Sequence, residues 1–127
     1  LQGVELVVLG YNTPKHYPPA PEHDHLQEFH NHLVLQAAAY QNGTWIVGVA
    51  KAGKEEDCEL IGGTCIIAPT GEIVTECKTL ADEVILAECD LDRCKEIQEN
   101  IFNFDLHRQP KDYALITAAK KEPPSNH

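Results

Sequence analysis

Four histidines stand close together in the first third of the chain, at a spacing that could suit a metal ion: His23, His25, His30 and His32. Imidazole nitrogens bind zinc and copper. The apolar residues between them predict a helix, on which positions two apart point roughly 200° away from each other. His25 and His32 then share one side and His23 and His30 another. We therefore expect a polar helix face and no metal site, with metal binding as the alternative that the spacing does not favour.

The candidate nucleophiles are the five cysteines Cys58, Cys65, Cys77, Cys89 and Cys94. A nucleophilic cysteine needs a stabilised thiolate, solvent access and a neighbouring base. Acidic neighbours of Cys58 disfavour its thiolate, Cys65 lies in an apolar run, and Cys94 shares the apolar side of a predicted helix. Their odd number and irregular spacing do not fit a disulfide framework. We expect five reduced, structural thiols and no catalytic residue within this chain.

Asn12 and Thr13 occupy a position typical of a ligand site. They follow an apolar run that predicts a strand over residues 4–9, and ligands of open α/β sheets bind beyond the carboxyl ends of parallel strands. A carboxamide and a hydroxyl can hydrogen-bond a small polar substrate. The alternative is that Asn12, Thr13 and Pro14 only initiate a turn. The residues alone weigh the two interpretations evenly.

The net charge of the chain indicates which kinds of binding partner are disfavoured. The 127 residues include ten basic and twenty acidic side chains, for a net charge of −10. This balance disfavours nucleic acid and anionic membranes. No run of about eighteen apolar residues predicts a membrane span, and residues 1–10 do not resemble a signal peptide. With the cysteines expected to be reduced, we expect a cytoplasmic protein that binds neither nucleic acid nor a membrane. Because the chain lacks methionine and begins with Leu1, we also expect it to be part of a longer polypeptide.

The most clearly predicted element is a helix that follows the proline-rich residues 11–22. This helix would position the histidines. Apolar residues recur along it at steps of three and four, which predicts one apolar stripe on the helix. Asp24 is the expected N-cap, and Asn42-Gly43 is a good helix end. The stripe consists of Leu26, Phe29, Leu33, Ala37 and Tyr40.

Strands and a second helix follow this helix. Residues 44–50 predict a strand, 51–59 a charged loop, 63–68 and 72–77 a hairpin around Pro69-Thr70-Gly71, and 84–89 a buried strand. A helix should begin at Asp90 or Asp92. The strand–helix–strand start favours a parallel pair, and the hairpin adds antiparallel strands, so we expect an α/β fold with a mixed sheet. Residues 1–119 should form the domain part and 120–127 a flexible tail.

Four strings carry a resemblance to a known family: GVELVVLGYNTP at 3–14, EHDHLQEFHNHLVLQAAAYQNGTW at 22–45, GGTCIIAPTGEIV at 62–74, and DEVILAECDLDRCKEIQENIFNFDLHRQPKDYALI at 82–116. Together they resemble the C-terminal part of the N-carbamoyl-D-amino acid amidohydrolases (D-carbamoylases), a branch of the nitrilase or carbon–nitrogen hydrolase superfamily. The hairpin pattern is common across the superfamily. The segments around Asn12 and 101–116 point to the D-carbamoylase branch.

The resemblance implies a fold and an activity. The fold would be part of a four-layer α-β-β-α sandwich. The activity would be hydrolysis of N-carbamoyl-D-amino acids to D-amino acid, carbon dioxide and ammonia through a thiol-carbamoyl intermediate, without a cofactor. The family's nucleophilic Cys, general-base Glu and intermediate-stabilising Lys would all lie upstream of Leu1. The chain alone is then expected to be inactive.

Two expectations about binding follow from the resemblance. Asn12 and Thr13 match the family's Tyr-Asn-Thr-Pro stretch and would bind the substrate. The helix over Asp24–Gln41 matches one at a subunit interface, which implies a homo-oligomer, either a dimer or a tetramer. The alternative is a non-catalytic nitrilase-like fragment that serves only in oligomerisation or binding.

Overall fold

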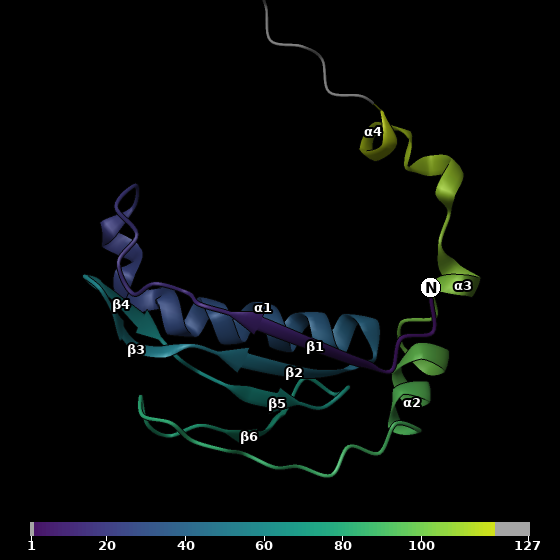
Figure 1. The fold of residues 1–127 in the computed structure, drawn as a ribbon. Coiled ribbons are helices and arrows are strands. Elements are labelled where there is room, and N and C mark those ends of the chain that lie inside the picture. Colours follow the sequence, from purple (N-terminus) through teal and green to yellow (C-terminus); the bar gives the residue numbers. More distant parts are fainter. Residues whose placement is uncertain (1, 119–127) are drawn as a thin grey trace, which may run out of the picture.

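The structure is a computed structural model that describes residues 2–118, and its centre is a four-stranded mixed sheet (Figure 1). The strand order is β1-β2-β5-β6. β1 (Leu6–Tyr11) runs parallel to β2 (Trp45–Ala50), whereas β5 (Cys65–Ile67) is antiparallel to β2 and to β6 (Ile73–Glu76). The expected mixed sheet and the expected hairpin are therefore both confirmed.

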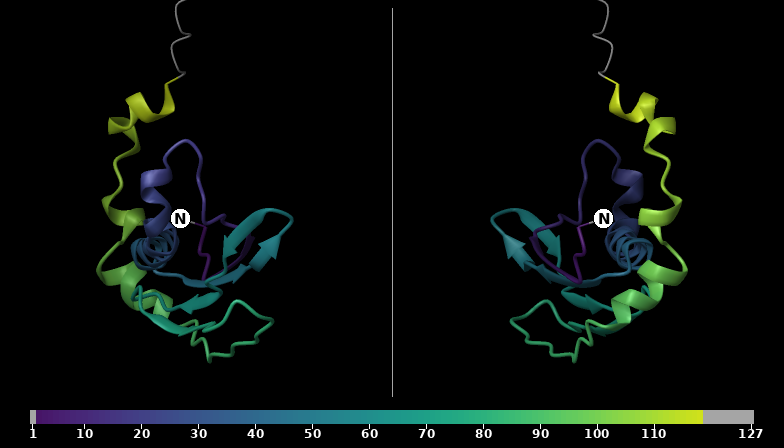
Figure 2. Two further views of the ribbon diagram at one scale, coloured as in Figure 1. Left: turned by 90° about the vertical axis from the view of Figure 1, so that its left-hand side faces the viewer. Right: turned by 90° about the vertical axis from the view of Figure 1, so that its right-hand side faces the viewer.

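A single helix makes the connection that parallel strands require. The 3₁₀ turn η1 (Pro21–Leu26) leads into α1 (Gln27–Asn42), which covers one face of the sheet (Figure 2). Gly43 ends α1 in the left-handed conformation, with φ of 56°, as expected. The expected N-cap is wrong, because Asp24 lies inside η1. Its carboxylate instead accepts hydrogen bonds from His16 Nδ1 at 2.6 Å and the Tyr17 backbone N–H at 2.9 Å.

The predicted apolar stripe is only partly covered, because its large side chains on α1 are exposed. Phe29 and Leu33 are 58% and 48% exposed. The buried side chains of α1 are Leu35 and Ala39, which do not belong to that stripe. The apolar side chains of the sheet bury Leu35 and Ala39 of α1. They leave Phe29 and Leu33 uncovered. α1 is therefore apolar on two sides.

Two clusters form the core, one on each face of the sheet, because alternate residues of a strand point to opposite faces. On the α1 face, Ile46, Cys65 and Ile67 pack against Leu35 and Ala39. On the other face, the central side chains are joined by Cys94 from α2 (Arg93–Asn100); they are Trp45, Ile66 and Ala68. The indole N–H of Trp45 donates to the Asp90 carbonyl at 2.9 Å, which ties α2 to the sheet.

Residues 51–59 were expected to be a loop, and this expectation is wrong for most of them. β3 (Ala52–Glu55) and β4 (Cys58–Ile61) form an antiparallel hairpin with Ala52 opposite Ile61. The hairpin projects from the sheet on the side away from α1 (Figure 2). Leu60 and Ile61 are buried at its base, whereas the acidic residues are at its tip. Burial of the base therefore outweighs the charge that suggested a loop.

The expected strand over 84–89 is not formed. The segment is extended, and Ile85 and Cys89 pack on the Trp45 cluster, but no strand pairs with it among residues 2–118. Val84 and Leu86 point outward and are 85% and 87% exposed. A strand needs a neighbour for its backbone groups, and the described part of the chain provides none.

The C-terminal elements continue away from the sheet (Figure 1). They are α3 (Phe104–His107), η2 (Pro110–Asp112) and α4 (Ala114–Thr117). The expected tail over 120–127 lies outside the described residues. Among the residues that the structure describes, no helix is long and apolar enough to cross a membrane.

Gly43 should be the least replaceable glycine of the fold. A Cβ there would meet Gln98 Cγ at 2.8 Å and Ile97 Cβ at 3.0 Å, in addition to the strain of a positive φ. Gly43→Ala should lower the free energy of unfolding by about 1–3 kcal/mol in urea titrations. Gly10→Ala is the matched control, because its Cβ would meet nothing closer than 3.9 Å. Equal stability losses in the two variants would contradict the special role of Gly43.

Candidate functional site

The residue before Asn12 and the residue after it are each held by a backbone hydrogen bond, and the two bonds come from different sheets. Before it, the Tyr11 carbonyl accepts from the Lys51 N–H at 2.9 Å, which extends the pairing of β1 with β2. After it, the Thr13 carbonyl accepts from the Ile61 N–H of β4 at 3.0 Å. Asn12 thus stands where the chain passes from the main sheet to the hairpin. Its side chain is exposed and makes no hydrogen bond within the described part of the chain.

A chain of side-chain hydrogen bonds fixes the residues on either side of Asn12. The Tyr11 hydroxyl donates to the Gly63 carbonyl at 2.8 Å and accepts from Asn31 Nδ2 at 3.0 Å. The Thr13 hydroxyl donates to Asn31 Oδ1 at 3.5 Å, a long contact. α1 is therefore linked through Asn31 to the end of β1 and through Tyr11 to the loop before β5.

Tyr11 and Asn31 are site residues that sequence reasoning missed. Burial raises the pKa of the Tyr11 hydroxyl, although the hydrogen bond from Asn31 acts in the opposite direction. Tyr11 is therefore a neutral donor near neutral pH, and its role is to hold the loop. The available signal was its place directly before Asn12. Nothing in the sequence near Asn31 indicated that its amide would reach this strand end.

Asn12 and Thr13 both lie at the end of β1, and Tyr11 beside them packs on the core cluster that contains Cys65. Burial raises the pKa of the Cys65 thiol to about 11, and the charge of Glu76 adds to this effect. Burial also raises the pKa of Cys89 and of Cys94. A raised pKa disfavours the thiolate that nucleophilic attack requires. These features support the structural interpretation of the buried thiols, which stays a prediction.

One of the two expected histidine pairs, His23 with His30, is in contact. The rings of His23 and His30 lie edge to face with centroids 6.4 Å apart. Within residues 2–118 no three His, Cys, Asp or Glu side chains come together in a way that could hold a metal ion. His32 packs beside Gly63, and its Nε2 is buried without a hydrogen-bond partner among the described residues.

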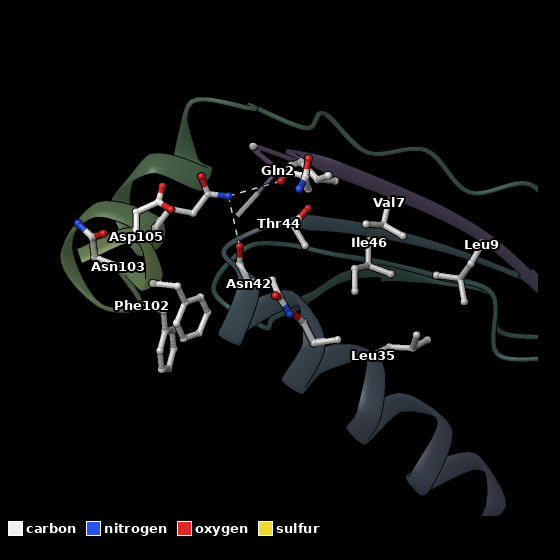
Figure 3. A pocket seen from close by; sticks show the side chains of 15 residues that line it. Gln2, Val7, Leu9, Leu35, Asn42, Thr44, Ile46, Phe102, Asn103 and Asp105 are labelled. Carbon is white, nitrogen blue, oxygen red and sulfur yellow. Dashed lines mark hydrogen bonds between the residues drawn. The ribbon is translucent and has the colours of Figure 1, made fainter. Parts of the chain in front are cut away.

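A large cavity lies at the other end of β1 from Asn12 (Figure 3). Its volume is about 620 Å³, and Val7, Leu9 and Leu35 form an apolar wall. Asp105 is its only lining carboxylate, and no cysteine or histidine among the described residues lines it. The apolar wall of the cavity therefore resembles an uncovered piece of core. A smaller cavity of about 310 Å³ lies at the proline-rich loop beside His16 and Asp24.

Comparison with known proteins identifies a family model and two curated relatives that match this chain. A carbon–nitrogen hydrolase family model matches residues 1–99. A probable nitrilase of Schizosaccharomyces pombe is 28% identical over 116 residues, which make up 91% of this chain and 39% of that protein. A Staphylococcus aureus protein described as a hydrolase in the agr operon is 29% identical over 72 residues, or 57% of this chain and 27% of that protein. The chain thus spans well under half the length of both curated relatives.

Solved structures share the fold. A carbon–nitrogen hydrolase of Helicobacter pylori superposes with a TM-score of 0.74 at 18% identity, covering 94% of this chain and 43% of that one. A mutant amidase of the nitrilase superfamily from Nesterenkonia gives a TM-score of 0.51 at 17% identity, over 83% and 36% of the two chains. These likenesses show the mixed α/β fold of the nitrilase superfamily.

The raised pKa of Cys65 predicts a loss of stability in alkaline solution. Between pH 9 and about 11 the folded protein keeps the Cys65 proton, while the unfolded chain, with an ordinary thiol pKa of 9.0, releases it. The free energy of unfolding should therefore fall as pH rises through this range. Urea titrations of Cys65→Ala should show a smaller fall than the parent chain. The exposed Cys58→Ala is the control, and an unchanged pH profile in Cys65→Ala would refute the prediction.

Proposed function

The chain belongs to the carbon–nitrogen hydrolase family, and we propose on that premise that it is the C-terminal part of an enzyme that hydrolyses N-carbamoyl-D-amino acids. The family implies a hydrolase that acts on carbon–nitrogen bonds. The narrower substrate rests on the resemblance of the strand end around Asn12 and of residues 101–116 to D-carbamoylases. Each turnover would consume one water and release a D-amino acid, carbon dioxide and ammonia.

One observation carries the proposal: Asn12 has a rigid backbone and an exposed carboxamide. Its neighbours are hydrogen-bonded into two different sheets, so the side chain is positioned without an intramolecular partner of its own among the described residues. A carboxamide can donate to a carboxylate and accept from a ureido N–H. Thr13 contributes a hydroxyl beside it. Both groups suit an N-carbamoyl amino acid, which carries a carboxylate and a ureido group.

In this proposal the reacting groups come from outside the chain. A general base would take the proton of a cysteine thiol as the sulfur attacks the ureido carbon, and a lysine would stabilise the tetrahedral intermediate. The bond from that carbon to the amino-acid nitrogen would then break, and the nitrogen would take the proton as the D-amino acid leaves. Water would cleave the remaining thiol-carbamoyl intermediate, which frees the thiol and gives a carbamate that breaks down to carbon dioxide and ammonia. The raised pKa values of the Cys65, Cys89 and Cys94 thiols disfavour the thiol attack at those three positions. Asn12 and Thr13 would bind and orient the substrate, which keeps the carbon to be attacked in one place.

The uncovered surfaces support a larger domain. β1 pairs on only one side, the cavity beside it is apolar, and the extended residues 84–89 have no partner strand in the described part of the chain. Monomeric proteins rarely expose connected apolar surface of this kind. The chain covers 39% of the S. pombe relative and 43% of the H. pylori structure. We propose that the remainder of the domain covers these surfaces and completes the four-layer sandwich.

Oligomerisation through the helix over Asp24–Gln41 belongs to the same proposal. The outward apolar stripe of α1 offers a surface for a second subunit. The alternative function, a non-catalytic module for oligomerisation or binding, is favoured by the same stripe. The two functions are distinguished by substrate turnover, because only the enzyme would hydrolyse an N-carbamoyl-D-amino acid.

Asn12→Ala in a polypeptide that includes the remainder of the domain should lower kcat/KM for an N-carbamoyl-D-amino acid by about tenfold to a hundredfold. This is the effect of removing a hydrogen bond to a charged substrate group. The measurement is ammonia release at subsaturating substrate. Asn100→Ala is the control, because that exposed amide bonds only the Glu96 carbonyl of its own helix. An unchanged kcat/KM in Asn12→Ala would remove Asn12 from the pocket, and no turnover by the parent polypeptide would favour the non-catalytic alternative.

The five cysteines of this chain should be dispensable for the chemistry. Single Cys→Ser substitutions at positions 58, 65, 77, 89 and 94 should preserve kcat in the same polypeptide, once the fraction of folded protein is taken into account. Those at the buried Cys65 and Cys94 should lower stability, because a hydroxyl replaces a thiol in an apolar cluster. Assays of kcat beside thermal unfolding separate the two effects. A loss of kcat without a loss of stability in any one variant would make that cysteine catalytic.

A further inference from the structure

One imidazole of α1 lies on the inward side of the helix, and no step of the proposed reaction uses it. His32 precedes the buried Leu35 by about one turn, on the side that packs on the sheet. Its Nε2 atom is buried and has no hydrogen-bond partner among the described residues. A Cβ on Gly63 would lie 3.3 Å from that nitrogen, so the ring fills the space beside a residue without a side chain. An unpaired buried nitrogen lowers stability, so its presence points to a function beyond packing.

Gly63 connects this imidazole to the strand end that presents Asn12. Its carbonyl accepts the hydrogen bond from the Tyr11 hydroxyl at 2.8 Å, and Tyr11 directly precedes Asn12. Gly62 and Gly63 both have positive φ, of 68° and 82°. Glycine adopts many backbone conformations at little steric cost, so a peptide between two glycines can turn more easily than its neighbours. The carbonyl that holds Tyr11 is therefore on a segment able to reorient.

The charge that a protonated His32 would meet comes from β6. The titratable groups on the elements that pack around His32 belong to α1, β1, β5 and β6; they are Glu28, Tyr11, Cys65 and Glu76. The hydrogen bond from Lys78 lowers the pKa of the Glu76 carboxyl, and a positive charge on His32 acts in the same direction. Because Glu76 is already paired with Lys78, it attracts a charge on His32 without providing a free acceptor.

The two protonation states of His32 differ in what the buried nitrogen needs. In a neutral ring Nε2 can be a bare acceptor, which rests against carbon at the cost of one missing hydrogen bond. Protonation makes Nε2 a charged N–H donor, and a buried donor of this kind needs an acceptor. The Gly63 carbonyl is the acceptor of the adjacent residue, and the Tyr11 hydroxyl already bonds it. Turning this peptide toward His32 would take the carbonyl away from Tyr11.

We propose that His32 is a positioning residue that makes the strand end at Asn12 respond to pH. When His32 takes up a proton, the Gly63 carbonyl turns toward it and releases the Tyr11 hydroxyl, so the residue before Asn12 loses a fixed contact. Histidine is the side chain that ordinarily changes charge between about pH 8 and 5. The consequence for substrate rests on the proposed function, because it assumes that Asn12 binds the substrate. The change at the strand end does not.

NMR spectroscopy of the polypeptide that includes the remainder of the domain tests this change without any turnover. Between about pH 8 and 5, the Cε1–H resonance of His32 and the side-chain amide resonances of Asn12 should shift with one common midpoint. His32→Gln should abolish the shift of Asn12, because glutamine has a similar reach but does not titrate. His30→Gln is the matched control, since His30 is exposed on the same helix, and it should leave the shift unchanged.

Tyr11→Phe tests the route of the coupling, and it also serves if His32→Gln does not fold. Phenylalanine lacks the hydroxyl that binds Gly63, so His32 should still titrate while the Asn12 amide no longer follows it. Circular dichroism checks that each variant is folded. Any of three results would overturn the inference: a His32 resonance that stays constant, an Asn12 amide that does not follow His32 in the parent, or one that still follows it in Tyr11→Phe.

Steady-state kinetics with an N-carbamoyl-D-amino acid separates this inference from the proposed function. Lowering the pH from about 7.5 to about 5.5 should raise KM about fivefold more in the parent than in His32→Gln, while the ratio of their kcat values stays constant. A purely structural role of His32 would change KM by the same factor at both pH values, which would exclude the effect on binding and leave the hydrolase proposal standing. A polypeptide without turnover would refute the hydrolase proposal, and the NMR titration would still decide the role of His32.

Discussion

The parallel pairing of β1 with β2 is the constraint on which the rest of the structure depends. Parallel neighbours cannot be joined by a tight turn, so the chain must leave the end of β1, cross the sheet and return. α1 makes that crossing and buries Leu35 and Ala39 on the sheet. Asn12 lies where the crossing begins, and its position follows from the pairing. The Tyr11 hydroxyl adds the link to the loop before β5.

The same helix has apolar residues on two sides. A helix that only covers a sheet needs one apolar side, whereas α1 also carries exposed apolar residues on its outward side. Its inward side buries Leu35 and Ala39 on the sheet. The outward side carries Phe29 and Leu33, whose size suits contact with another element. The candidate pocket and the candidate interface thus share one helix, joined through Asn31.

The uncovered surfaces are of two kinds, which differ in whether they border the core. The edge of β1, the cavity beside it and the extended residues 84–89 border the core, and each lacks a neighbour of the kind that core elements have within the described part of the chain. Residues 104–118 instead form a segment that leads away from the sheet and exposes Leu115 and Ile116. The first group borders the core, and the second does not.

The sequence by itself determined the mixed sheet, the hairpin around Pro69, the end of α1 at Gly43 and the family, because these depend on local patterns. Alternation of apolar residues and a glycine with positive φ act over a few residues. Only the tertiary structure decided which side of α1 is buried, that charged residues after Lys51 pair as β3 and β4, and that 84–89 stays unpaired. It also decided that Tyr11 and Asn31 support Asn12. These outcomes depend on contacts between residues far apart in the chain, and an apolar stripe looks the same whether it faces a sheet or another subunit.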